Sequence, residues 1–84
     1  MKLRTEGVTW QEIDGELVIL DLESSSYLTT NVAGALLTKR LTEEATEQDL
    51  VDALIAEFGI DENTARTDAT AFVNQLREKS LLVE

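Results

Sequence analysis

The chain has 84 residues, of which 17 are acidic and 7 are basic, and its formal net charge is −10. It contains no cysteine and no histidine, which excludes a disulfide framework, thiolate or imidazole metal ligands, and catalysis by imidazole. The negative charge argues against nucleic acid and anionic membranes as partners, because both would repel it.

Three β-strands are predicted in the first part of the chain. Val8–Ile13 and Glu16–Leu22 flank Asp14-Gly15, a pair typical of two-residue hairpin turns because glycine readily adopts a positive φ. The second of these runs is almost continuously apolar over 17–20, which predicts a central strand with little exposure on either face. A third strand over Ser26–Thr30 has polar neighbours on both sides, and we expect it at the edge of the sheet.

Helical periodicity begins after Asn31, whose side chain is suited to cap the first helical turn. The pattern predicts helices near 32–41, 47–58 and 62–79. Thr46 and Asp61 are expected to cap the second and third helices, and Gly59 to end the second one. The expected apolar stripe of the third helix consists of Ala65, Ala69, Phe72, Val73 and Leu76. The apolar tail 80–83 is expected to pack back on the core.

These elements predict an α+β fold of the winged helix-turn-helix type, in which a three-stranded antiparallel sheet precedes a three-helix bundle. The sequence has no linker and no internal repeat, so we expect residues 1–84 to form a single domain. No apolar stretch is long enough to span a bilayer, and the first residues do not resemble a secretory signal. The expected location is therefore the cytoplasm.

No motif for catalysis, a metal or a cofactor is recognisable. The carboxylates are scattered over predicted turns and helix faces, and no glycine-rich phosphate loop is present. Trp10 is expected to pack on the sheet, whereas Tyr27 can either pack or flank a binding groove. The small residues Ala65 and Ala69 of the third helix allow either close packing or a shallow groove, with Asp68 and Gln75 on one flank of the stripe. We expect a protein that is not an enzyme and needs no cofactor.

The order and spacing of several segments resemble the PqqD-like family, also called RiPP recognition elements. The resemblance runs from about Trp10 to the end of the chain. Its matching segments are 17–22, 26–34, Leu50…Leu54…Phe58-Gly59-Ile60-Asp61 and Asp68…Phe72…Leu76…Leu81-Leu82. Two positions depart from the family pattern: Ser80 stands where glycine or another small residue is usual, and Thr30 stands where leucine often precedes the capping Asn31. Segment 20–34 is most similar to the stand-alone lasso-peptide B1 proteins.

The resemblance implies a non-enzymatic chaperone that binds the leader of a ribosomally made precursor peptide. An extended leader would add to the edge strand by β-augmentation, and its side chains would enter a cleft between the third strand and the third helix. The implied peptide-binding residues are Ser25, Ser26, Tyr27, Leu28, Thr29, Thr30, Ala65, Asp68, Ala69, Phe72 and Leu76. The implied partners are the precursor leader peptide, a leader peptidase of the B2 type and a macrolactam synthetase.

Three other functions are the alternatives to this one. A chaperone of pyrroloquinoline quinone synthesis usually carries a Pro-Glu-Gly turn in this region, and the chain has no proline. A winged-helix module that binds DNA needs a cationic third helix, which the sequence does not provide. An acyl-carrier-like protein needs an Asp-Ser phosphopantetheine site, and no Asp-Ser pair occurs here.

Overall fold

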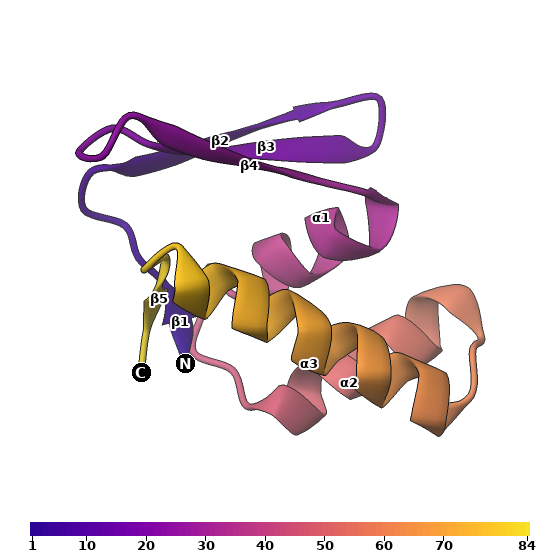
Figure 1. The fold of residues 1–84 in the computed structure, drawn as a ribbon. Coiled ribbons are helices and arrows are strands. Elements are labelled where there is room, and N and C mark those ends of the chain that lie inside the picture. Colours follow the sequence, from indigo (N-terminus) through magenta and orange to yellow (C-terminus); the bar gives the residue numbers. More distant parts are fainter.

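The computed structural model describes residues 1–84 and has the predicted α+β architecture. A three-stranded antiparallel sheet of β2 (Val8–Ile13), β3 (Glu16–Asp21) and β4 (Ser26–Thr30) lies over three helices (Figure 1). The helices are α1 (Val32–Arg40), α2 (Glu47–Phe58) and α3 (Glu62–Glu78). The prediction of the fold class is confirmed, and each predicted strand and helix lies within one residue of its observed bounds.

The local signals in the sequence determine the ends of these elements. Asn31, Thr46 and Asp61 cap α1, α2 and α3, and Thr46 forms a complete capping box with Asp49. Gly59 ends α2 in the left-handed conformation, with φ of 64°. Asp14 and Gly15 both have positive φ, as a tight hairpin turn between β2 and β3 requires.

Two short strands near the chain ends were not predicted. β1 (Lys2–Leu3) pairs antiparallel with β5 (Leu82–Val83), so the first and last residues of the chain form a separate two-stranded sheet. Leu81 is buried just before β5, which confirms that the C-terminal segment packs on the core.

The core lies between the inner face of the three-stranded sheet and the helices. Leu17 and Ile19 of β3 are fully buried, and the five stripe residues of α3 are also buried. The outer face of β3 is less protected than predicted, because Val18 and Leu20 are only half-buried and no helix covers that face. Trp10 lies on the inner face of β2, at the edge of the sheet, and is 37% exposed.

Candidate functional site

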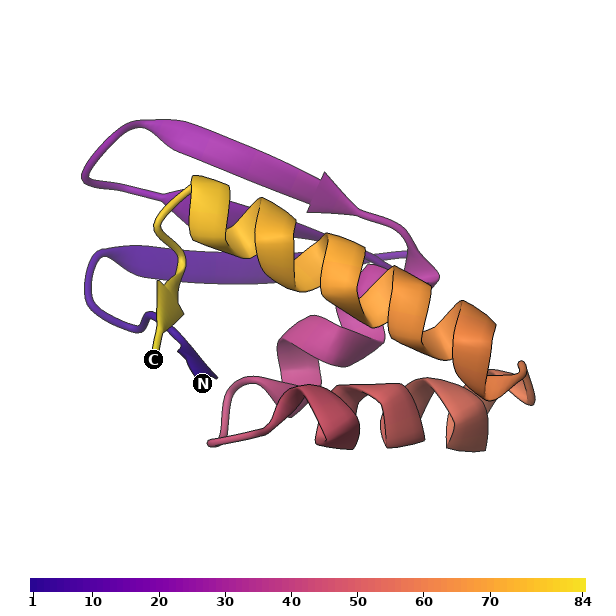
Figure 2. The same cartoon turned by 60° about the horizontal axis from the view of Figure 1, so that its bottom comes forward.

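The sheet has two edges, β2 and β4, and a groove lies next to each end of β4. The strand order is β2-β3-β4, which confirms that Ser26–Thr30 is an edge strand. Figures 1 and 2 show that β4 and α3 run in opposite directions. An edge strand presents unpaired N–H and C=O groups at alternate residues. The open side of β4 can therefore pair with another extended chain.

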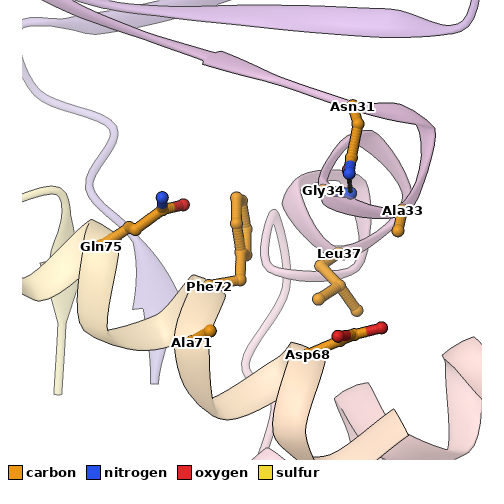
Figure 3. Close-up of a pocket in the computed structure, with 8 residues that line it drawn as sticks. All are labelled: Asn31, Ala33, Gly34, Leu37, Asp68, Ala71, Phe72 and Gln75. Atoms are coloured by element: carbon orange, nitrogen blue, oxygen red, sulfur yellow. Dashed lines mark hydrogen bonds between the residues drawn. The ribbon is translucent and has the colours of Figure 1, made fainter. Parts of the chain in front are cut away.

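The groove at the C-terminal end of β4 lies between α3 and the start of α1. It has a volume of about 230 Å³. Figure 3 shows the side chains that line it, with Phe72 and Gln75 projecting from α3 toward the side formed by α1 and β4. The lining residues are Asn31, Ala33, Gly34, Leu37, Asp68, Ala71, Phe72 and Gln75. We call it the leader groove, after the peptide that the family resemblance implies as a ligand.

Gly34, which has no side chain, forms part of one wall of the leader groove. A Cβ atom on Gly34 would lie 2.8 Å from the Cβ of Thr30 and 3.1 Å from Cε1 of Phe72. Thr30 is held in place, because it is buried and its hydroxyl donates to the carbonyl of Leu17 at 3.1 Å. The glycine therefore allows α1, β4 and α3 to meet closely at this point.

Polar groups rim the leader groove around an apolar floor. Oδ1 of Asn31 accepts from the N–H of Gly34 at 2.9 Å, so the Asn31 side chain both caps α1 and lines the groove. Asp68 and Gln75 are exposed on α3, and no cationic side chain lines this groove. The groove can thus accept an apolar side chain and offer hydrogen-bond acceptors to a donor group at its rim.

A second, polar groove lies at the other end of β4. It runs between the β3–β4 turn and the end of α3, and its lining residues are Arg4, Asp21, Glu23, Ser24, Ser26, Glu78, Lys79 and Ser80. Nη2 of Arg4 lies 2.7 Å from Oδ1 of Asp21, and Nη1 of Arg4 donates to the carbonyl of Ser80 at 3.0 Å. Arg4 therefore joins the β3–β4 turn to the end of α3.

Asp21 also organises the turn that leads into β4. Its Oδ1 accepts from the backbone N–H of Glu23 at 3.1 Å, and Ser25 in the same turn has φ of 60°. Burial alone would raise the pKa of Asp21, but hydrogen bonds from Ser24, Arg4 and the backbone of Glu23 together hold its pKa below the ordinary value. The carboxylate is the form that these donors stabilise.

The structure places the site residues that the sequence suggested in three different settings. Asp68 and Phe72 line the leader groove, and Leu28 is half-buried on the inner face of β4. Ala65, Ala69 and Leu76 have no exposed surface, so they support α3 from the core side and are not accessible from the groove. The remaining implied residues are Ser25, Ser26, Tyr27, Thr29 and Thr30; they form the edge strand and the residue before it, and Thr30 is buried.

Tyr27 does not share a face with Leu28. Cross-strand pairing places Leu28 opposite the buried Ile19, whereas Tyr27 is opposite Leu20 on the outer face and is 64% exposed. The two side chains cannot line the same cleft, because successive residues of a strand point to opposite faces. Tyr27 is available to a partner only on the outer face of the sheet.

Several groove residues were not singled out by the sequence. Asn31 and Gly34 were noted as a cap and as part of the family pattern, and Ala33, Leu37 and Ala71 had no recognised role at the site. Gly34 in the first turn of α1 was the available signal, because glycine is unfavourable in a helix unless close packing requires it. No group of three or more carboxylates could hold a metal ion, and no helix is both long and apolar enough to cross a membrane.

Comparison with known proteins gives one family and two similar solved structures. Residues 16–82 match the family of coenzyme PQQ synthesis protein D (PqqD). One similar structure is TbiB1 in complex with the TbiA(beta) leader peptide, with 32% identity, a TM-score of 0.85, and coverage of 98% of this chain and 94% of that one. The other is a lasso peptide synthetase B1 complexed with the leader peptide, with 26% identity, a TM-score of 0.81, and coverage of 99% and 96%. No curated protein matches the sequence.

Proposed function

This protein belongs to the family of coenzyme PQQ synthesis protein D (PqqD), and we propose that it binds the leader region of a ribosomally synthesised precursor peptide, the precursor of a lasso peptide. The single observation that carries the proposal is the open edge strand β4 beside the leader groove, in a chain 32% identical to a protein solved with a leader peptide. Membership of the family alone also allows a chaperone of pyrroloquinoline quinone synthesis. The two leader complexes of B1 proteins favour the lasso-peptide role.

The proposed mechanism is the addition of a fourth strand to the sheet. The leader lies along β4, and its backbone pairs with the N–H and C=O groups that β4 leaves open. A strand of five residues such as β4 spans about 17 Å at roughly 3.4 Å per residue. Main-chain pairing of this kind contributes affinity that depends little on the leader sequence.

Selectivity comes from the leader groove in this mechanism. Alternate side chains of an added strand point to the same face, and one of them enters the groove against Phe72 and Leu37. Asp68 at the rim accepts a hydrogen bond from a hydroxyl or a cationic group of the leader. Ala65, Ala69 and Leu76 act indirectly, because they fix the position of α3 relative to the sheet.

The protein has no catalytic step in this proposal. It acts in the cytoplasm, holds the leader in an extended form, and presents the precursor to a leader peptidase of the B2 type and to a macrolactam synthetase. The binding protein thereby raises the effective concentration of the precursor at the enzymes.

Titration calorimetry with a synthetic leader tests the proposal. Asp68→Ala should leave the fold intact, because the side chain is exposed, and should weaken leader binding by about 1–3 kcal/mol if the complex buries its hydrogen bond. Asp52→Ala is the matched control, since Asp52 is an exposed carboxylate on α2 away from the leader groove. Equal leader affinity for the two variants would exclude Asp68 from the site, and a wild-type protein that binds no leader would refute the function.

A further inference from the structure

The β3–β4 turn, residues 22–25, has no buried apolar side chain to hold it against the helices. All four residues are exposed, and the one large apolar side chain among them, Leu22, is 65% exposed. The turn lies at the same end of the molecule as the C-terminal end of α3 (Figures 1 and 2). The groove between them has only polar and charged lining residues. At this end, β4 is therefore held near α3 by polar contacts.

The opposite end of β4 is held by close packing. Thr30 is buried, and the lack of a side chain at Gly34 lets α1 approach both Thr30 and Phe72 of α3. Leu28, between the two ends, packs against the core. The open edge of β4 thus runs between one packed attachment and one polar attachment. A strand added to β4 follows the direction of β4, so both attachments determine where its side chains lie relative to the leader groove.

Arg4 makes the polar attachment. Its backbone N–H donates to the carbonyl of Leu81 at 2.8 Å, and its Nη1 donates to the carbonyl of Ser80 at 3.0 Å. Nη2 of the same guanidinium lies 2.7 Å from Oδ1 of Asp21. The Asp21 side chain is buried, and its Oδ1 also accepts from the backbone N–H of Glu23 in the turn. Arg4 is thus fixed beside the end of α3 and holds the start of the β3–β4 turn from there.

The ion pair between Arg4 and Asp21 constrains geometry more than it stabilises the fold. Nε of Arg4 is buried without a hydrogen-bond partner, and the removal of both charged groups from water offsets much of the attraction between them. The guanidinium nevertheless fixes direction well, because its donors lie in one rigid plane and reach two acceptors at once. These two acceptors belong to the β3–β4 turn and to the end of α3, so the contact sets the distance between these segments.

We propose that Arg4 is a positioning residue for leader binding, which holds the start of β4 at the distance from α3 that an added leader strand requires. The role rests on the proposed function and extends it to a residue that does not line the leader groove. Arg4 acts through Asp21 and the turn that leads into β4. Without this contact the turn is free to move relative to α3, and the binding of the leader has to order it at a cost in affinity.

Titration calorimetry with a synthetic leader peptide tests this role in four variants of the full chain. Arg4→Met removes the cation, and Arg4→Lys keeps a charge opposite Asp21. The double variant Arg4→Met/Asp21→Asn removes both charges and keeps an oxygen that can accept from the N–H of Glu23. Replacement of both members of a buried ion pair is often neutral for stability, so the double variant separates leader affinity from folding. Arg77→Met is the matched control, because Arg77 near the end of α3 also bonds a carboxylate, that of Glu84, but lines neither groove beside β4.

We expect Arg4→Met and the double variant to bind the leader about tenfold more weakly than wild type, because β4 is no longer preorganised for the leader. Arg4→Lys should recover part of this loss, and Arg77→Met should bind like wild type. Amide exchange of the complexes should show less protection at the start of β4 in the double variant than in wild type, with the protection at Thr30 retained. A double variant that is folded by circular dichroism and binds the leader like wild type would overturn the role, as would equal weakening by Arg77→Met. Absence of leader binding by the wild type would instead refute the proposed function.

Discussion

Gly34→Ala tests the packing that shapes the leader groove. In most helices this change is favourable, because alanine is about 1 kcal/mol better than glycine in a helix interior. Gly34 has ordinary helical geometry, and its φ is not positive. The backbone conformation therefore does not require glycine at this position. Any loss of stability on substitution must therefore come from steric contact.

The structure indicates that the steric term exceeds the gain in helix propensity. The new Cβ would lie 2.8 Å from the Cβ of Thr30, and that atom cannot move away by side-chain rotation because it is attached directly to the backbone. The ring of Phe72, 3.1 Å away and 7% exposed, has little room to shift. Overpacking of this kind costs about 1–3 kcal/mol, so we expect a net loss of about 1 kcal/mol after the gain of about 1 kcal/mol in propensity.

Urea unfolding followed by circular dichroism measures this difference. A loss of about 1 kcal/mol should lower the midpoint of thermal unfolding by about 4–8 °C in a domain of this size. Ala71→Gly in the middle of α3, where residue 71 is exposed, reports the propensity term in the same protein. If Gly34→Ala raises the free energy of unfolding by as much as Ala71→Gly lowers it, the steric reasoning is wrong.

Two further predictions concern helix ends. Ser80 has φ of 57°, and the backbone N–H groups of Ser80 and Leu81 donate to the carbonyls of Arg77 and Leu76. Ser80→Gly should raise the free energy of unfolding in urea by about 0.5 kcal/mol, because glycine adopts this conformation without the cost of about 1–2 kcal/mol that other residues incur. A loss of stability would contradict this prediction. Hydrogen bonds from the backbone N–H and the side chain of Thr64 lower the pKa of Asp61 below its ordinary value of 3.8. The stability that this shift contributes is present above the ordinary value and lost as the pH falls through the lower pKa of the folded state. Asp61→Asn should therefore lose less stability than wild type as the pH falls below the ordinary pKa of 3.8, and identical pH profiles would refute that role.

The fold was predictable because its signals are local. Asn31, Thr46 and Asp61 act on N–H groups within three residues of themselves, and the two-residue turn at Asp14-Gly15 fixes the first hairpin. Pairing of β1 with β5 could not be predicted, since two-residue strands carry no periodic signal and their partners lie at opposite ends of the chain.

The site was predictable only in part, because it depends on how the elements pack. The sequence placed Asp68 and Gln75 on one flank of the α3 stripe but did not indicate which flank lines a groove, and the structure shows that both residues line it. The sequence did not indicate whether Ala65 and Ala69 would be buried or would form the floor of a groove. In the structure both are fully buried, because the packing of α3 against the other elements covers them. Strand alternation alone is enough to separate Tyr27 from Leu28, because neighbouring residues of a strand point to opposite faces of the sheet.

Amide hydrogen exchange of β4 tests the central claim most directly. The protein is compared with and without the synthetic leader peptide, and exchange is followed by NMR for each N–H of Ser26–Thr30 and of Val8–Ile13 on the opposite edge. We predict that alternate amides of β4 gain protection when the leader binds, because the leader supplies their missing acceptors, and that the amides of β2 do not change. Leader binding that leaves β4 exchange unchanged, or that protects β2 instead, would contradict strand addition at β4.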